Sequence, residues 1–210
     1  HEFKSPLAAV KLNLQTMQKH ALNEEQKRNI LLSSISETDR LNKLVEDALT
    51  AAQIETHTYS ISHEEFNLSE CIYNTMRSRL QSGMQRIDME ITDNIFIKGD
   101  CMALSSILIN LVDNAIKYSN EVQHVLIELK RSDKHAVLRI SDSGIGIPDS
   151  EKVKVFQKFY RIGNEDTRKT KGTGLGLYIV AQLVKMHEAE ITVSNNKPQG
   201  SVFTITIPLV

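Results

Sequence analysis

The sequence contains no tryptophan, and aromatic residues make up only 5% of its 210 residues. Any hydrophobic core must therefore be built mainly from aliphatic side chains. Long apolar runs are missing too, since none approaches the roughly 18 residues that span a membrane, and no secretory signal pattern is present. The charges nearly cancel, because 25 basic and 26 acidic residues give a formal net charge of −1. We therefore expect no nucleic-acid partner, and membrane contact only through segments outside these residues.

Cysteine is scarce as well. Cys71 and Cys101 are the only two in the chain, and neither has a second cysteine nearby in the sequence. This spacing fits neither a disulfide framework nor a zinc ribbon. We interpret both as reduced residues of a protein in a cytoplasmic setting.

Two glycine clusters, at 142–148 and 172–177, stand out, but the sequence contains no P-loop. The second cluster has the spacing G-x-G-x-G, which differs from the G-x-G-x-x-G of a dinucleotide-binding fold. A glycine loop before a helix lets backbone N–H groups approach a phosphate, and the helix N-terminus adds positive potential. Two ordinary turns are the alternative interpretation.

The first 56 residues contain one proline and no glycine, and their apolar residues recur at steps of three and four. This spacing predicts two antiparallel helices, separated by the polar segment 20–25. The predicted seam comprises Leu7, Val10, Leu14, Met17, Ala21, Leu31, Ser34, Thr38, Leu41, Val45, Ala48 and Ala52, and a flanking row comprises Leu32, Ile35, Leu44 and Leu49. Together these rows are wider than a two-helix seam needs. We expect two copies to form a four-helix bundle; the alternative is that the hairpin packs on the rest of its own chain.

After a short polar linker at 57–62, strands and helices alternate. The segment 67–70 (Asn-Leu-Ser-Glu) is a capping box that opens a helix to about residue 80. Strands are predicted at 87–91, 95–98, 122–131, 136–141, 191–194 and 201–207, and helices at 100–118 and 173–187. This order predicts the α+β class for residues 63–210, with a mixed sheet and helices on one face.

The predicted helix 100–118 carries a polar stripe. Its members are Asn110, Asn114, Lys117 and Tyr118. Amide oxygens suit a hard cation such as Mg²⁺, the ammonium suits a phosphate, and the ring suits stacking on a base. A solvated helix face is the alternative. It accounts for Lys117 but poorly for two asparagines in mid-helix, because asparagine is a weak helix former.

Residues 152–171 form a long segment without clear periodicity. Seven basic and two acidic residues give it a local charge of +5; they are Lys152, Lys154, Lys158, Arg161, Arg168, Lys169 and Lys171, with Glu165 and Asp166. A cationic loop flanked by glycine clusters predicts a mobile lid over a phosphate site, which Phe156 and Phe159 could anchor. A solvated surface loop is the alternative.

Five blocks of the sequence, taken together, resemble the bacterial sensor histidine kinases of two-component systems. Residues 1–7 look like the H box of that family, 108–119 like the N box, 142–148 like the first glycine box, 155–161 like the F box and 172–177 like the second glycine box. The resemblance implies a dimerisation and histidine-phosphotransfer hairpin over 1–56, the linker at 57–62, and a catalytic ATP-binding domain of the gyrase and Hsp90 type over 63–210.

The resemblance implies that His1 is the phosphoacceptor nucleophile and that Glu2 orients or deprotonates its imidazole. Neutral imidazole is a good nucleophile near neutral pH, and a carboxylate on its second nitrogen would stabilise the imidazolium as it forms. Ser5 lies one turn after His1, where the family often has threonine or asparagine. Dephosphorylation of a response regulator is therefore a further expectation.

The resemblance also implies an ATP and Mg²⁺ site. Asn114 would be the main magnesium ligand, and Asn110 would assist at the metal and in catalysis. Lys117 would contact phosphate, Tyr118 would lie against the base, and Asp142 would accept the adenine amino group. Arg161 would reach toward the polyphosphate, and the pocket and lid hinges would be formed by Gly144, Gly146, Ile147, Gly172, Thr173, Gly174, Leu175 and Gly176.

The expected function is therefore that of a kinase core that phosphorylates His1 and passes the phosphoryl group to an aspartate of a response regulator. An ATP-hydrolysing clamp related to gyrase or Hsp90 is one alternative, but such proteins typically carry a water-activating glutamate where this chain has Asn110. An inactive dimeric scaffold is another, although it should lack a key residue such as Asn114 or Asp142. Because the reactive residue is number 1, we expect a longer parent protein, anchored in the bacterial inner membrane, of which this is a cytoplasmic portion.

Overall fold

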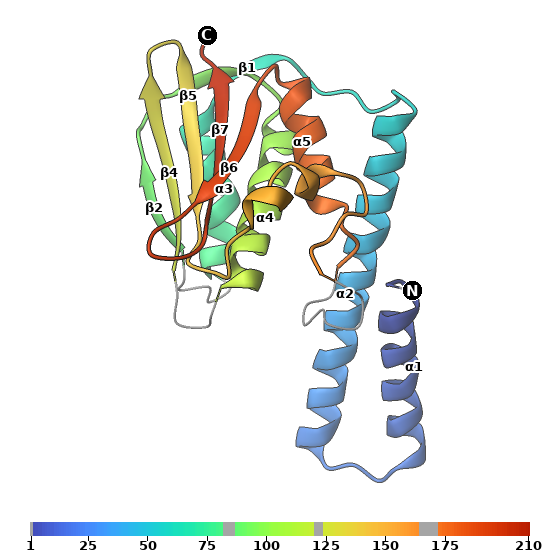
Figure 1. The fold of residues 1–210 in the computed structure, drawn as a ribbon. Helices are drawn as coiled ribbons and strands as arrows, with labels where there is room; N and C mark the ends of the chain where they lie inside the picture. Colours follow the sequence, from blue (N-terminus) through green and yellow to red (C-terminus); the bar gives the residue numbers. More distant parts are fainter. Residues whose placement is uncertain (1, 82–86, 120–123, 164–171) are drawn as a thin grey trace.

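The computed structural model of the protein describes residues 2–81, 87–119, 124–163 and 172–210. It begins with the predicted helical hairpin, formed by α1 (Lys4–Lys19) and α2 (Glu24–Glu55). Asn23 starts α2 with a reciprocal capping box, because its Oδ1 accepts the N–H of Gln26 at 2.8 Å and Gln26 Oε1 accepts the N–H of Asn23 at 3.1 Å. Figure 1 shows the hairpin projecting from the rest of the molecule, while the later turns of α2 lie beside the sheet and its helices.

One apolar face of the hairpin stays uncovered within the chain. Leu31, Ile35 and Leu49 on α2 are 48%, 57% and 58% exposed. Leu41 of the predicted seam is half-buried, whereas Leu44, expected in the flanking row, is buried. The seam is thus split between two faces, because one neighbouring helix covers only a narrow strip of α2.

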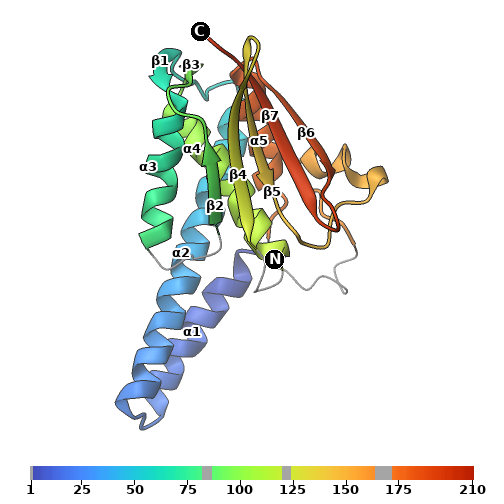
Figure 2. The ribbon, with the colours of Figure 1, turned by 90° about the vertical axis from the view of Figure 1, so that its left-hand side faces the viewer.

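No helix in the described part of the chain is both long enough and apolar enough to cross a membrane. The 32 residues of α2 exceed the length of a typical span, but charged residues recur along the whole helix. The length of α2 is instead used in the hairpin, where α1 packs along the first half of α2 (Figure 2).

The later residues form the predicted mixed sheet. Its strands are β2 (Ile87–Ile91), β4 (Val125–Ser132), β5 (His135–Ser141), β7 (Ser201–Pro208) and β6 (Glu190–Asn195), in this spatial order. The β2–β4 pair is parallel and the other pairs are antiparallel. A separate pair is formed by β1 (Glu64–Asn67) and β3 (Phe96–Gly99). The sequence does not predict β1, because Glu64-Glu65-Phe66-Asn67 shows no alternation of polar and apolar residues.

Three helices cover one face of the sheet, as predicted (Figures 1 and 2). They are α3 (Leu68–Gln81), α4 (Cys101–Tyr118) and α5 (Gly176–Met186), and two short 3₁₀ turns, η1 (Asp149–Glu151) and η2 (Lys154–Phe156), precede α5. Between the layers lies an aliphatic core that includes Ile127 of β4, Ile140 of β5 and Leu111 of α4, each fully buried. The α+β prediction and the aliphatic core expected from the shortage of aromatics are both confirmed.

The end of α2 packs on this domain. Ala51 and Ile54 are buried in the same apolar cluster as the inner face of α5. Two ion pairs add to the contact: Lys43 Nζ lies 2.7 Å from Asp113 Oδ2 of α4, and Lys158 Nζ lies 2.8 Å from Oε1 of Glu55. The hairpin therefore packs on its own chain where α2 ends, while the apolar face of Leu31, Ile35 and Leu49 stays exposed along the length of α2.

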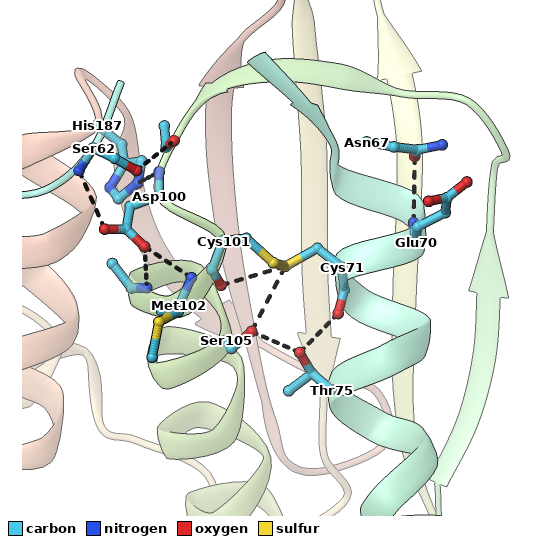
Figure 3. Close-up of a disulfide and its surroundings, with 12 residues drawn as sticks. Ser62, Asn67, Glu70, Cys71, Thr75, Asp100, Cys101, Met102, Ser105 and His187 are labelled. Atoms are coloured by element: carbon cyan, nitrogen blue, oxygen red, sulfur yellow. Dashed lines mark hydrogen bonds between the residues drawn. A yellow bond between two sulfur atoms is a disulfide. The ribbon is translucent and has the colours of Figure 1, made fainter. Parts of the chain in front are cut away.

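The interpretation of the two cysteines as reduced residues is wrong. Cys71 in the first turn of α3 and Cys101 at the start of α4 form a disulfide, with their Cα atoms 6.1 Å apart (Figure 3). Beside it, Thr75 Oγ1 donates to the backbone carbonyl of Cys71 and lies 2.7 Å from Ser105 Oγ. Sequence spacing could not indicate the pairing, because it arises from two helices that pack side by side. The bond ties α3 to the helix that carries the asparagine stripe.

Asp100 fixes the start of that helix. Its Oδ1 accepts the N–H groups of Met102 and Ala103 at 2.8 and 3.1 Å, and its Oδ2 accepts that of Ser62 at 3.2 Å. Burial acts to raise the pKa of Asp100, but these hydrogen bonds outweigh it, so that the pKa is lowered and the cap stays ionised. The N–H of Asp100 in turn donates to Nε2 of buried His187 at 3.0 Å, which anchors α4 to the end of α5 (Figure 3).

Candidate active site

Helix α4 separates its two stripes as the sequence predicts. The apolar stripe is buried in the core: Leu104, Leu108, Leu111 and Ala115. The polar stripe runs from buried Asn110 through half-buried Asn114 to exposed Lys117 and Tyr118. This gradient places one edge of α4 at the rim of the domain, where it meets the glycine clusters.

Asn110 is oriented by its own helix. Its Nδ2 donates to the backbone carbonyl of Ser106 at 3.0 Å. Its Oδ1 lies beside Gly176, where a Cβ would stand 3.0 Å from that oxygen. Because the amide nitrogen is used within α4, the oxygen is the atom presented to the second glycine cluster.

Lys117 brings the end of α4 to the start of the same cluster. The Lys117 Nζ lies 5.0 Å from the centre of the Tyr118 ring, and a Cβ on Gly172 would stand 3.0 Å from the same Nζ. An ammonium beside a glycine backbone is a suitable arrangement for binding a phosphate. Residues far apart in the sequence therefore meet here, as the motif order predicts.

Asp142 is the buried carboxylate of the first glycine cluster, only 5% exposed. Its Oδ1 accepts two backbone N–H groups, from Gly144 at 2.8 Å and from Ser201 at 3.2 Å. Burial raises the pKa of Asp142, and the two hydrogen bonds offset only part of that rise. Both bonds engage one oxygen, so the carboxylate is fixed in direction while Oδ2 remains for a ligand.

The turn between β6 and β7 supports Asp142, a contact that the sequence does not predict. Asn196 Nδ2 donates to the Asp142 carbonyl at 2.7 Å, and the Asp142 N–H donates to the Ser201 carbonyl at 2.9 Å. Gly200 packs directly against the backbone of Asp142 with a φ of +122°. The only sequence signal is the Pro-Gln-Gly turn at 198–200, which does not show what it packs against.

The first glycine cluster closes onto the end of α4. The N–H of Ile145 donates to the carbonyl of Tyr118 at 3.3 Å. A Cβ on Gly144 would overlap that carbonyl oxygen, so only glycine allows the approach. Ile147 is half-buried and packs on the core. Of the predicted pocket residues of this cluster, Gly144 thus lies between Tyr118 and Asp142, whereas Gly146 faces Gly200.

The second glycine cluster contacts the F-box segment. Gly174 has a φ of +73°, and a Cβ there would stand 2.7 Å from the carbonyl carbon of Phe159. The Phe159 N–H donates to the Gly174 carbonyl at 3.1 Å, and Leu175 is buried. The Thr173 hydroxyl accepts the N–H of Leu175 at 3.3 Å. The cluster is therefore anchored in the core by Leu175 and contacts the backbone of Phe159.

Helix α5 starts at Gly176, and in the described part of the chain no side chain caps its N-terminus. The first backbone N–H groups of a helix need partners, and the helix dipole favours an anion there. Because Lys117 and Asn110 both lie next to this cluster, the N-terminus of α5 is suited to bind a polyphosphate.

The basic segment is less cationic than its composition indicates. Each described lysine or arginine within 152–161 lies in an ion pair: Lys152 with Asp149, Lys154 with Glu151, Lys158 with Glu55 and Arg161 with Glu2. Arg168, Lys169 and Lys171 lie outside the described residues. Two of the four carboxylates come from the hairpin, so the described part of the predicted lid also links the two parts of the chain.

Glu2 lies at the point where the hairpin meets that segment. Its Oε1 is 3.2 Å from Arg161 Nη1, and its Oε2 is 3.0 Å from Arg40 Nη2 of α2. Ser5 is exposed. His1, the predicted nucleophile, lies outside the described residues, but it is covalently next to Glu2. The structure thus brings Glu2, two positions before α1, into contact with the domain that carries the glycine clusters.

Comparison with known proteins covers both parts of the chain. Residues 1–57 match the family described as His Kinase A (phospho-acceptor) domain, and residues 99–210 match the Histidine kinase-, DNA gyrase B-, and HSP90-like ATPase family. The chain is 32% identical to the circadian input-output histidine kinase CikA of Synechococcus elongatus, over 99% of this chain and 29% of CikA. It is 29% identical to the sensor histidine kinase WalK of Bacillus subtilis, over 99% of this chain and 35% of WalK. The chain therefore spans about a third of the length of these relatives.

A solved structure has the same fold. Full-length ShkA in complex with AMPPNP is similar over all of this chain and 44% of ShkA, with a TM-score of 0.71 and 25% identity. The two family matches follow one another in the order in which the five motifs occur. The chain belongs to the sensor histidine kinases, with a phospho-acceptor domain followed by an ATPase domain of the histidine kinase, gyrase B and HSP90 type.

Proposed function

We propose that the chain is an ATP-dependent protein-histidine kinase core, which phosphorylates His1 and transfers the phosphoryl group to an aspartate of a response regulator. The observation that carries this proposal is the contact between Arg161 and Glu2. It joins the ATPase domain to the residue next to His1. In this proposal residues 1–56 are the phosphotransfer hairpin, 57–62 the linker and 63–210 the catalytic domain.

The pocket between α4 and the two glycine clusters is suited to ATP. Asp142 Oδ2 would accept the adenine amino group, and Tyr118 would lie against the base. Lys117 and the N-terminus of α5 would bind the phosphates. The ShkA structure is a complex with AMPPNP, and this chain has the same fold.

The residues of α4 also fit Mg²⁺. The ion prefers oxygen ligands and keeps several waters, so one or two side-chain oxygens are enough. The hydrogen bond from Asn110 Nδ2 to Ser106 leaves the amide oxygen toward the glycine cluster, and Asn114 lies one turn further along α4. We assign Asn114 and Asn110 as its ligands. Bound Mg²⁺ would neutralise charge on the phosphates.

The chemistry of the hairpin residues is a direct displacement. One ring nitrogen of neutral His1 attacks the γ-phosphorus, the bond to the β–γ bridging oxygen breaks, and ADP leaves. The Glu2 carboxylate acts as a general base and accepts the proton on the other ring nitrogen. In the second transfer an aspartate oxygen of the response regulator attacks the phosphorus and the N–P bond breaks. We expect Ser5, which is exposed and follows His1 by four positions, to help a water dephosphorylate that partner.

Incubation with γ-labelled ATP and Mg²⁺ tests this function. We expect acid-labile label on the wild-type chain and none on His1→Gln, because only the imidazole forms the phosphoramidate. Phosphate release without label on the protein would instead indicate an ATP-hydrolysing clamp. Label on His1→Gln equal to the wild type would exclude His1 as the acceptor.

The exposed apolar face of the hairpin predicts a dimer. Leu31, Ile35 and Leu49 lie along one side of α2 and remain open in the single chain. A second copy would cover them in a four-helix bundle, since the self-complementary stripe belongs to the hairpin itself. We expect Ile35→Glu to weaken the dimer roughly 100-fold or more, because each copy loses apolar burial and gains a buried charge.

Sedimentation equilibrium measures this effect. Asn29→Glu is the matched control, because it adds the same charge at an exposed polar position of the same helix. We expect it to leave the dimer dissociation constant unchanged. A monomeric wild-type chain at micromolar concentration, or an undiminished dimer of Ile35→Glu, would contradict the four-helix bundle.

A further inference from the structure

Four alternating charges connect the hairpin to the ATPase domain. Arg40 of α2 lies between two carboxylates: its Nη1 is 3.3 Å from Oε2 of Glu37, one turn earlier, and its Nη2 is 3.0 Å from Oε2 of Glu2. The other Glu2 oxygen, Oε1, is 3.2 Å from Nη1 of Arg161. The four charges sum to zero, and each side chain keeps at most 31% of its surface exposed. The motifs account for Glu2 and Arg161, but no motif includes Arg40.

Glu2 needs an external partner to act on His1. Glu2 lies just before α1, and because side chains one position apart do not face each other on a helix, we expect its carboxylate to reach the preceding side chain only in a selected rotamer. Glutamate has several rotatable bonds, and fixing them costs conformational entropy. A guanidinium on the facing helix can hold the carboxylate in one place, because its rigid fork binds two acceptors at once. Arg40 uses its two terminal nitrogens in this way, one on Glu2 and one on Glu37.

We expect ATP binding to affect the contacts of Arg40 and Arg161 with Glu2 differently. Arg161 belongs to the ATPase domain, and the proposed polyphosphate site would attract it away from Glu2. Arg40 belongs to the hairpin and is anchored on its own helix by Glu37, so it stays with Glu2 when Arg161 leaves. A carboxylate has about four lone-pair positions on its two oxygens, so Glu2 can bind Arg40 and still accept a proton from imidazole.

We propose that Arg40 is a positioning residue for the phosphorylation of His1, acting through the Glu2 carboxylate. This inference rests on the proposed kinase function and adds to it a residue of α2 that lies outside the sequence motifs. Arg40→Gln keeps much of the side-chain length but removes the charge and the fork. We expect its maximal rate of His1 phosphorylation to fall about tenfold, a part of the 10²–10⁴-fold that a well-placed base contributes. The KM for ATP should stay within about twofold, because the nucleotide pocket is untouched.

A double-substitution cycle separates positioning from general stabilisation. The rates to compare are those of the wild type, Arg40→Gln, Glu2→Gln and the double variant. If Arg40 acts through Glu2, the double variant is no slower than Glu2→Gln alone. Arg40→Lys should recover part of the rate, because an ammonium can still reach Glu2 but cannot bind Glu2 and Glu37 with a fork. Lys27→Gln is the control: it breaks an ion pair with Glu24 at the same i, i+3 spacing on the same helix and should not change the rate.

Three results would overturn the inference: a rate for Arg40→Gln equal to that of the wild type, effects that multiply in the double variant, or a loss confined to KM. Thermal unfolding of each variant is measured alongside. If Arg40→Gln unfolds at the assay temperature, the cycle is run with Arg40→Lys, for which the same non-additivity is expected. A wild-type chain that takes no label would refute the proposed kinase function itself. Normal wild-type labelling with unaffected Arg40 variants would refute only this role of Arg40.

Discussion

Asp142→Asn is expected to weaken ATP binding roughly 100-fold or more without unfolding the protein. The reason lies in the two N–H groups, from Gly144 and Ser201, that bind Oδ1. If the new amide places its oxygen there, its NH₂ group faces the adenine amino group, and two donors meet. If the amide is flipped, its NH₂ group meets the two backbone donors instead. Neither orientation satisfies both sides of the side chain.

The same substitution should not destabilise the nucleotide-free protein and can stabilise it. Burial raises the pKa of Asp142, so the folded state holds its proton more tightly than the unfolded chain does. The stabilising contribution of that proton is present below the unfolded pKa and is lost as the pH rises through the folded pKa. At neutral pH the buried carboxylate is therefore destabilising, and a neutral amide removes that cost. The thermal midpoint of nucleotide-free Asp142→Asn should equal or exceed that of the wild type.

Calorimetric titration with AMPPNP and thermal unfolding with and without it measure both effects. ATP binding by the wild type should also weaken on acidification from a higher pH than an ordinary aspartate would give, because binding needs the carboxylate. Asp149→Asn is the control, since it changes an exposed aspartate of η1 in the same way and should bind AMPPNP normally. Tight binding by Asp142→Asn would show that another group recognises the adenine.

The features that the sequence predicted well are those governed by local periodicity. A helix such as α4 has to bury Leu104 and Leu111 on one side, and this requirement alone places Asn110 and Lys117 on the opposite edge. Patterns of this kind depend on residues a few positions apart.

The features that the sequence missed depend on partners far apart in the chain. The pairing of Cys71 with Cys101 follows from the packing of α3 on α4, and no spacing rule contains that information. Arg40 looks like any charged residue of a long helix until the fold brings Glu2 beside it. Neither partner of such a contact has a distinctive sequence pattern around it, so the contact becomes visible only in the folded structure.

Gly200→Ala is expected to lower the free energy of unfolding by about 4 kcal/mol, the sum of a strained backbone and an overpacked contact. The φ of Gly200 is +122°, a conformation that side chains rarely adopt. A Cβ there would overlap the carbonyl oxygen of Asp142 and stand 2.7 Å from its carbonyl carbon. Both are backbone atoms, so no side chain can rotate away to relieve the contact.

The displacement should also reach the nucleotide pocket. The β6–β7 turn holds Asp142 through Asn196 and Ser201, and moving Gly200 away from Asp142 weakens those hydrogen bonds. Urea unfolding measures the stability, and Gly146→Ala is the control, with a positive φ but a looser contact. Gly146 also has a positive φ, +74°, but a Cβ there meets its nearest atom, the Gly200 carbonyl oxygen, at 3.3 Å. That variant should lose only about 1 kcal/mol; an equal loss in both would mean that backbone strain, rather than contact with Asp142, makes glycine necessary at position 200.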